Sequence, residues 1–135
     1  MIVSFFVYGT LKRGECRAQM WPVEPLSVVP AFARGTLFDR DDYPAMLRGS
    51  DRVHGECWQF DSGDAPAVVA ALDRIEGANQ PGIPDLYQRV TVEVLGLEAD
   101  LSVQAYTYHY ASDPLLDGFR RMTPNEGGFV SWPAG

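Results

Sequence analysis

The chain has 135 residues, of which 46% are hydrophobic and 12% aromatic, so it can form one packed core but is too short for two. This composition excludes a disordered or low-complexity chain. The net charge is −7, from 18 acidic and 11 basic side chains, and the basic residues form no run. Nucleic-acid binding depends on clustered Lys and Arg, so we expect no nucleic-acid partner.

The apolar start of the chain, Met1–Val7, is far too short to span a membrane and has no basic region or cleavage site of a signal peptide. We therefore expect no membrane partner and a cytoplasmic protein. Cys16 and Cys57 lack the spacing and the partners of a zinc site. Reduced thiols are favoured over a single disulfide.

Most of the chain is predicted to form strands. The run Ile2–Tyr8 is continuous, apolar and rich in β-branched and aromatic residues, as is typical of a buried central strand. A loop follows to Gly14, and a short helical turn is expected at Arg17–Trp21. Further strands are predicted at Ser27–Asp39, Val53–Asp61, Tyr87–Leu97 and Leu101–Tyr110, the last two as a hairpin.

One segment is predicted to be a helix. Asp64 or Ser62 can cap it, Pro66 suits its first turn, and Gly77 can end it. Its apolar residues recur at spacings of three and four and form one stripe: Ala65, Val68, Val69, Leu72 and Ile75. The segment Ala78–Asp85 is expected to be an exposed loop, and residues 113–135 to be irregular and partly packed. Together these elements predict one α+β, mainly β domain over residues 1–135, a small closed or nearly closed barrel with one or two flanking helices.

The segment Tyr8–Gly14 is the first candidate for a binding site. Because Gly9 directly follows a buried strand, the backbone can turn sharply there and aim successive N–H groups at one spot. Such a nest binds anionic or polarised oxygens. The alternative is that Gly9 and Gly14 only shape a turn.

Glu76 is the second candidate, because it continues the apolar stripe of the predicted helix. Burial and the negative end of the helix dipole would both raise its pKa toward the range of a general base. The alternative is an exposed, frayed last turn. Asp73, one residue outside the stripe, is expected to be solvated or bonded to Arg74 or Arg89.

Tyrosines and histidines are weaker candidates. Tyr106, Tyr108 and Tyr110 share one face of the last predicted strand, and a half-buried outer face is favoured over a polar pocket wall. His54 and His109 have no partners spaced for a metal site, and no Ser or Cys lies in a nucleophile motif such as GxSxG.

The chain resembles the γ-glutamyl cyclotransferase-like superfamily, closest to its γ-glutamylamine cyclotransferase branch. The matching motifs come in the family's order and cover about residues 3–110. They are Phe6–Gly14, Tyr43-Pro44, Gly55-Glu56 before Trp58, Leu72–Gly77 and Leu86–Arg89. Any one of these is weak, whereas the ordered set is specific.

The resemblance implies a mixed β-barrel that needs no metal or organic cofactor. It also implies an enzyme that closes a γ-glutamyl group to 5-oxoproline and releases an amine. The family's catalytic glutamate falls on Glu76. Its substrate loop falls on Tyr8, Gly9, Thr10 and Leu11, with Tyr43 and Tyr87 lining the pocket. The expected partner is a small γ-glutamyl compound, and the oligomeric state stays open.

Two segments depart from the family's pattern. Glu15-Cys16-Arg17 stands where many relatives carry Asn or His, and the loop Ala78–Asp85 looks longer than usual. Both lie toward the leaving-group side, so the leaving amine is undetermined. Two other functions stay open. One is a non-catalytic binder of γ-glutamyl compounds, and the other is a protein-interaction module with Trp21, Trp58 and Trp132 exposed in one patch.

Overall fold

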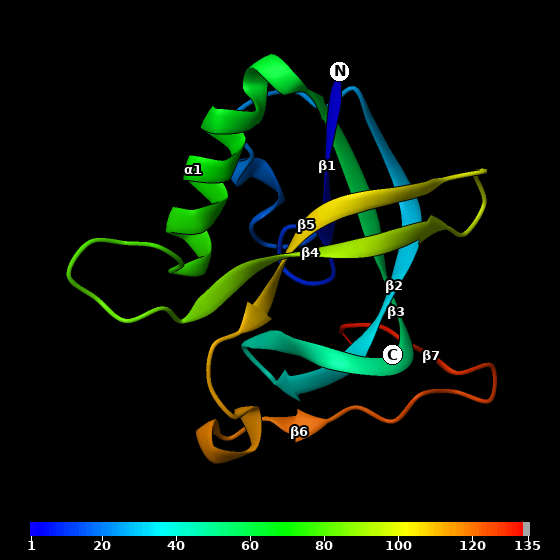
Figure 1. Cartoon of the computed structure of the whole chain (residues 1–135). Helices are drawn as coiled ribbons and strands as arrows, with labels where there is room; N and C mark the ends of the chain where they lie inside the picture. Colours follow the sequence, from blue (N-terminus) through cyan, green and yellow to red (C-terminus); the bar gives the residue numbers. More distant parts are fainter. Residues whose placement is uncertain (134–135) are drawn as a thin grey trace.

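The computed structural model describes residues 1–133 and is built mainly from strands (Figure 1). The strands are β1 (Ile2–Val7), β2 (Ser27–Arg40), β3 (Tyr43–Asp61), β4 (Tyr87–Gly96), β5 (Ser102–Tyr110), β6 (Arg120–Arg121) and β7 (Phe129–Val130). The helix α1 spans Ala65–Glu76, and short 3₁₀ turns lie at Ala18–Met20, Ser62–Asp64 and Pro114–Asp117. No helix in the described part of the chain is long and apolar enough to cross a membrane.

Five strands close into a barrel. They follow one another in the order β2-β4-β5-β1-β3, and pairing of β3 with β2 closes the ring. The pair β1–β5 is parallel, at Phe5 and Tyr106, and the other four pairs are antiparallel. The prediction of a small mixed barrel with a flanking helix is therefore confirmed. The short strand β6 pairs with β2 at Phe38 and Asp39, and β7 pairs with β3 at Arg52 and Val53.

Strand β1 is buried on both faces and divides the core in two. Phe6 packs inside the barrel with residues from the other four strands, among them Val53 and Val94. Phe5 and Val7 point the other way, into a second cluster that includes Val68 and Leu72 of α1. This alternation follows from the period of two along a strand, and it explains the uninterrupted apolar run at the start of the chain.

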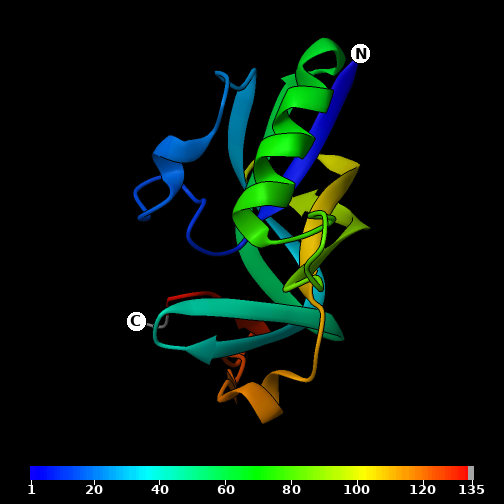
Figure 2. The same cartoon turned by 90° about the vertical axis from the view of Figure 1, so that its left-hand side faces the viewer.

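Helix α1 lies beside β1 along one side of the barrel (Figure 2). Pro66 stands in its first turn, as expected, but the Asp64 side chain makes no capping hydrogen bond, and Ser62–Asp64 instead form a 3₁₀ turn. At the other end Gly77 is left-handed, with φ 67°, and the amide of Ala78 donates to the carbonyl of Asp73 at 2.8 Å. This C-cap stops the helix at Glu76.

The long β2–β3 hairpin differs from the expected pattern. Strand β3 begins at Tyr43 rather than Val53, and the register shifts where Gly35 pairs with Asp51 and Thr36 with Leu47. The residues between Leu47 and Asp51 bulge out of the ladder, so the hairpin bends beyond the barrel. The segment after residue 113, expected to be irregular, contributes a 3₁₀ turn and the short strands β6 and β7.

Candidate active site

A pocket of about 250 Å³ lies between the end of β1 and the C-terminal end of α1. This volume is just below the roughly 300–1,000 Å³ of sites for drug-sized ligands, and it suits a small metabolite. All seven residues predicted for the site line this pocket. They are Glu76, Tyr8, Gly9, Thr10, Leu11, Tyr43 and Tyr87.

Glu76 is partly buried and faces the pocket as the last residue of α1. Burial raises the pKa of its carboxyl to about 7, and the nearby positive charge of Arg17 opposes part of that rise. The exposed, frayed end considered from the sequence is therefore wrong. A carboxyl with this pKa exists in both protonation states near neutral pH, which is the property of a group that takes up and gives back a proton.

Asp73 anchors the end of α1 to the barrel. Its Oδ1 accepts a 2.6 Å hydrogen bond from the Tyr108 hydroxyl, and its Oδ2 pairs with Arg89 and accepts from Asn79. Burial alone would raise the pKa of Asp73, but these hydrogen bonds outweigh it and hold the pKa below its usual range. The expected bond between Asp73 and Arg89 is confirmed, and it fixes the helix turn that carries Glu76.

In the loop after β1, the carbonyl oxygens accept hydrogen bonds within the protein, whereas the amides are unpaired among residues 1–133. The carbonyls of Gly9, Thr10 and Leu11 accept hydrogen bonds from the amide of Lys12, the amide of Arg17 and the indole N–H of Trp21, at 3.1, 2.8 and 3.0 Å. Within residues 1–133 the amides of the same three residues donate no hydrogen bond. Three unpaired amides in a pocket wall can bind a carboxylate or carbonyl oxygen.

Gly9 is required here for contact rather than for its φ angle. A Cβ at this position would lie 2.6 Å from Cγ of Pro44, which is too close for any real pair of atoms. Gly14 has φ 84° and open space around it, so it shapes the turn. The alternative, in which the glycine only shapes a turn, therefore applies to Gly14, whereas Gly9 lets the loop after β1 pack against Pro44.

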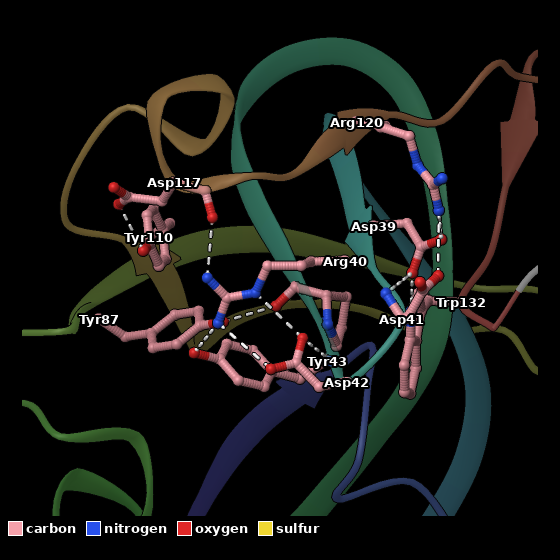
Figure 3. A network of polar contacts seen from close by, with 11 residues as sticks. Asp39, Arg40, Asp41, Asp42, Tyr43, Tyr87, Tyr110, Asp117, Arg120 and Trp132 are labelled. Carbon is pink, nitrogen blue, oxygen red and sulfur yellow. Dashed lines mark hydrogen bonds and ion pairs between the residues drawn. The ribbon is translucent and has the colours of Figure 1, made fainter.

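Three tyrosines of the wall are held by hydrogen bonds. Tyr8 donates to the carbonyl of Tyr108 and Tyr87 to the carbonyl of Pro44, both at 2.6 Å. Burial raises the pKa of both phenols above the ordinary value, so they are neutral. Tyr43 accepts from Arg40, whose guanidinium also contacts Asp42 and the carbonyl of Asp117 (Figure 3).

Tyrosines of β5 lie deeper than expected. Tyr108 and Tyr110 are buried in the cluster between barrel and helix, and Tyr106 is partly buried beside them. The predicted half-buried outer face is therefore wrong for two of the three, because α1 and the segment around Phe119 cover it. Tyr108 lines the pocket as well.

Sequence reasoning gave no role to several residues of the wall. Arg17, Thr107 and Tyr108 line the pocket, as do Ile75 and Leu86. Thr107 is fully buried and donates to the carbonyl of Phe6 at 2.8 Å. The departure from the family's pattern at residues 15–17 was the one signal that pointed to Arg17.

The tryptophans do not form the exposed patch of an interaction module. Trp58 and Trp132 are buried in different clusters, and Trp21 is partly buried, stacked on Trp58 with a ring separation of 4.3 Å.

Cys16 and Cys57 are free thiols, one exposed and one buried. Residues 1–133 contain no group of three or more His, Cys, Asp and Glu side chains placed to hold a metal ion.

The protein is thus a closed mixed barrel that holds a carboxyl and unpaired amides in one pocket. Residues 5–127 match the family described as "Gamma-glutamyl cyclotransferase, AIG2-like". The chain therefore belongs to this family. A search of curated proteins gave no match.

Solved structures support the same assignment. An AIG2-like protein from Mus musculus is 25% identical with a TM-score of 0.65, covering 98% of this chain and 97% of that one. A protein from Arabidopsis thaliana is 27% identical with a TM-score of 0.65, covering 87% and 68%. A structure described as a gamma-glutamyl cyclotransferase is 12% identical with a TM-score of 0.52, covering 90% and 70%. The last is a likeness of fold alone.

Proposed function

We propose that the protein is a cyclotransferase that cleaves a γ-glutamyl amide and releases 5-oxoproline and a free amine. One observation carries the proposal. A carboxyl with a pKa of about 7, that of Glu76, shares a pocket with the unpaired amides of Gly9, Thr10 and Leu11. Membership of the family supports the reaction class.

The reaction needs a proton carrier and a binding site for a folded substrate. Glu76 takes a proton from the substrate α-ammonium, and the freed amine attacks the γ-carbonyl carbon to close a five-membered ring. The bond to the leaving nitrogen then breaks as Glu76 returns the proton to that nitrogen. The ring nitrogen still carries a second proton from the former ammonium, and this proton passes to the released amine, which departs as an ammonium ion. Because nucleophile and electrophile belong to one molecule, the main work of the pocket is to hold the reactive conformer.

The substrate-binding roles follow from the pocket wall. The amides of Gly9, Thr10 and Leu11 bind oxygens of the glutamyl end, while Tyr43 and Tyr87 shape the side of the pocket. Residues of the chain carry out both the proton transfer and the substrate binding, and we propose no metal or organic cofactor. A cytoplasmic location is also a proposal, and we leave the oligomeric state open.

The test is 5-oxoproline release from a panel of γ-glutamyl amines and γ-glutamyl amino acids, with Glu76→Gln as the matched variant. We expect turnover by the wild type and a loss of at least about 100-fold in the variant, the usual scale for general acid–base groups. Thermal unfolding checks that the variant folds. An equally active variant would contradict the role of Glu76. Binding without release by the wild type would instead support a non-catalytic binder.

A further inference from the structure

Arg17 is a charged pocket residue to which the proposed reaction gives no role. Of the described residues that line the pocket, two carry a charge, Glu76 and Arg17. Arg17 is partly exposed, and its Nη1 lies 3.5 Å from the carbonyl oxygen of Ile75, a long hydrogen bond. No carboxylate among residues 1–133 forms an ion pair with it. Its guanidinium therefore has donors left for a ligand.

Burial separates the pocket into a floor and a rim. Phe6 and Thr107, on neighbouring barrel strands, are at most 1% exposed and form the floor. Leu86 is 44% exposed, and Ile75 and Arg17 are partly exposed, so these three form the rim. A ligand that fills the pocket has its inner end on the floor and its outer end beside Arg17.

A γ-glutamyl substrate fits this division in one orientation. The substrate loop follows β1 directly, with Tyr8, Thr10 and Leu11 all buried, so its amides lie on the inner side and take the glutamyl head. Glu76 must reach the scissile nitrogen, so the leaving amine lies next to the end of α1. The rim formed by Arg17, Ile75 and Leu86 then surrounds the leaving amine.

We propose that Arg17 binds a carboxylate on the leaving amine, and that the enzyme therefore prefers γ-glutamyl α-amino acids to γ-glutamyl amines without a carboxylate. This inference rests on the proposed function. A guanidinium presents a planar fork of N–H donors that matches a carboxylate, and such charged pairs are among the strong hydrogen bonds. Ile75 and Leu86 give the side chain of the leaving amino acid an apolar surface.

Position favours an α-carboxylate over one at the end of a long chain. Arg17 contacts the carbonyl of Ile75, the residue directly before Glu76. In an α-amino acid the carboxylate carbon is two bonds from the nitrogen that Glu76 protonates. Two neighbouring residues can therefore serve one leaving group, Glu76 at its nitrogen and Arg17 at its carboxylate. Arg17 would also compensate the negative charge that such a substrate brings close to Glu76.

The test compares γ-glutamyl-alanine with γ-glutamyl-ethylamide, which has no carboxylate on the leaving side. At a pH well above the pKa of Glu76, we expect Arg17→Gln to lower kcat/KM about 10-fold or more with the first substrate, the scale of a charged hydrogen bond, and less than about 2-fold with the second. Arg17→Lys should recover part of the loss. The control Arg74→Gln removes an exposed positive charge from the last turn of α1 outside the pocket and should change neither value.

Binding separates this inference from the proposed function. Calorimetry in a Glu76→Gln background, with and without Arg17→Gln, measures affinity for both compounds without turnover. A loss confined to γ-glutamyl-alanine supports the inference even if the wild type releases no 5-oxoproline, the result that overturns the proposed function. Equal losses with both compounds would place Arg17 on the glutamyl head and overturn the inference. No loss with either, or no binding of either compound, would overturn it as well.

Discussion

The hydroxyl of Tyr108 donates a 2.6 Å hydrogen bond to Oδ1 of Asp73, and this bond joins the pocket wall to the helix that ends in Glu76. The other oxygen of Asp73 pairs with Arg89 on β4. The last turn of α1 is therefore attached to two neighbouring strands of the barrel. Charged hydrogen bonds of this kind fix geometry because leaving one partner unpaired in the interior is costly.

Removing the carboxylate of Asp73 should weaken both the fold and the site. For Asp73→Asn we expect a loss of about 2–4 kcal/mol in the free energy of unfolding, because Arg89 would keep a charge without its partner. Tyr108→Phe should cost about 1 kcal/mol. Urea unfolding measures both. Tyr106→Phe is the matched control, since the Tyr106 hydroxyl forms no hydrogen bond within residues 1–133. An equal effect in the control would contradict the role of the Tyr108 bond.

The partly buried carboxyl of Glu76 should make stability depend on pH. Its pKa rises from 4.5 to about 7 on folding, so the folded protein binds more protons than the unfolded chain between these values. Stability from this group is therefore present below about pH 4.5 and lost as the pH rises to about 7. Glu76→Gln removes this loss. The free energy of unfolding of the variant, relative to that of the wild type, should therefore be about 2 kcal/mol higher at about pH 8 than at about pH 5. Chemical denaturation at the two pH values measures the difference. A constant difference would contradict the raised pKa.

Arg17 should also influence the pH at which the proposed activity appears. Burial raises the pKa of Glu76, and the positive charge of Arg17 lowers it. If Glu76 must be ionised to accept the first proton, the acidic limb of kcat/KM reports its pKa in the free enzyme. For Arg17→Gln we expect this limb to move to higher pH with γ-glutamyl-ethylamide. The substrate has no leaving-group carboxylate, so the profile isolates the electrostatic effect. A limb that stays in place would show that the charge does not act on Glu76.

Much of this site could be predicted because local patterns determine it. The apolar run of β1, the stripe of α1 and the stop at Gly77 place Glu76 on the inward side of a helix end. The first half of β3 could not be found, because Pro44 and the bulge at Arg48 and Gly49 interrupt the pattern of a strand, and the pairing depends on β2 lying beside it. The departure at residues 15–17 drew attention to Arg17, but its place in the pocket could not be predicted. Its place in the pocket depends on how the turn after Gly14 packs against the end of α1, which is a tertiary contact.

Gly9 should tolerate no side chain. A Cβ there would lie 2.6 Å from Cγ of Pro44, and a proline ring cannot swing away as a flexible side chain can. Gly9→Ala should therefore displace the substrate loop, lower kcat/KM about 10-fold or more and cost about 1–3 kcal/mol of stability. Gly63→Ala is the control, because the nearest atom to its Cβ would be Oδ2 of Asp61 at 3.7 Å, and we expect a change within about 0.5 kcal/mol. Wild-type activity in Gly9→Ala would show that the loop geometry is not critical.

The end of the described chain should position the substrate loop. Lys12 Nζ donates to the carbonyl of Trp132. The Trp132 indole donates in turn to Oδ1 of Asp39 at 2.7 Å (Figure 3). Lys12→Met keeps the apolar stem but breaks this link. We expect kcat/KM to fall several-fold, about 3–10-fold, with a stability loss of about 1 kcal/mol.

The matched control for Lys12 is its neighbour Arg13, whose side chain is 59% exposed and, within residues 1–133, forms only a long surface pair with Glu56 at 3.7 Å. Arg13→Met should leave both kcat/KM and the free energy of unfolding nearly unchanged, as is usual for surface pairs. Because Lys12 and Arg13 belong to the same turn, a common effect on that turn would lower the activity of both variants alike. A loss in Lys12→Met alone would assign the effect to the bond with Trp132. Equal losses would assign it to the turn and contradict a positioning role for the C-terminal segment.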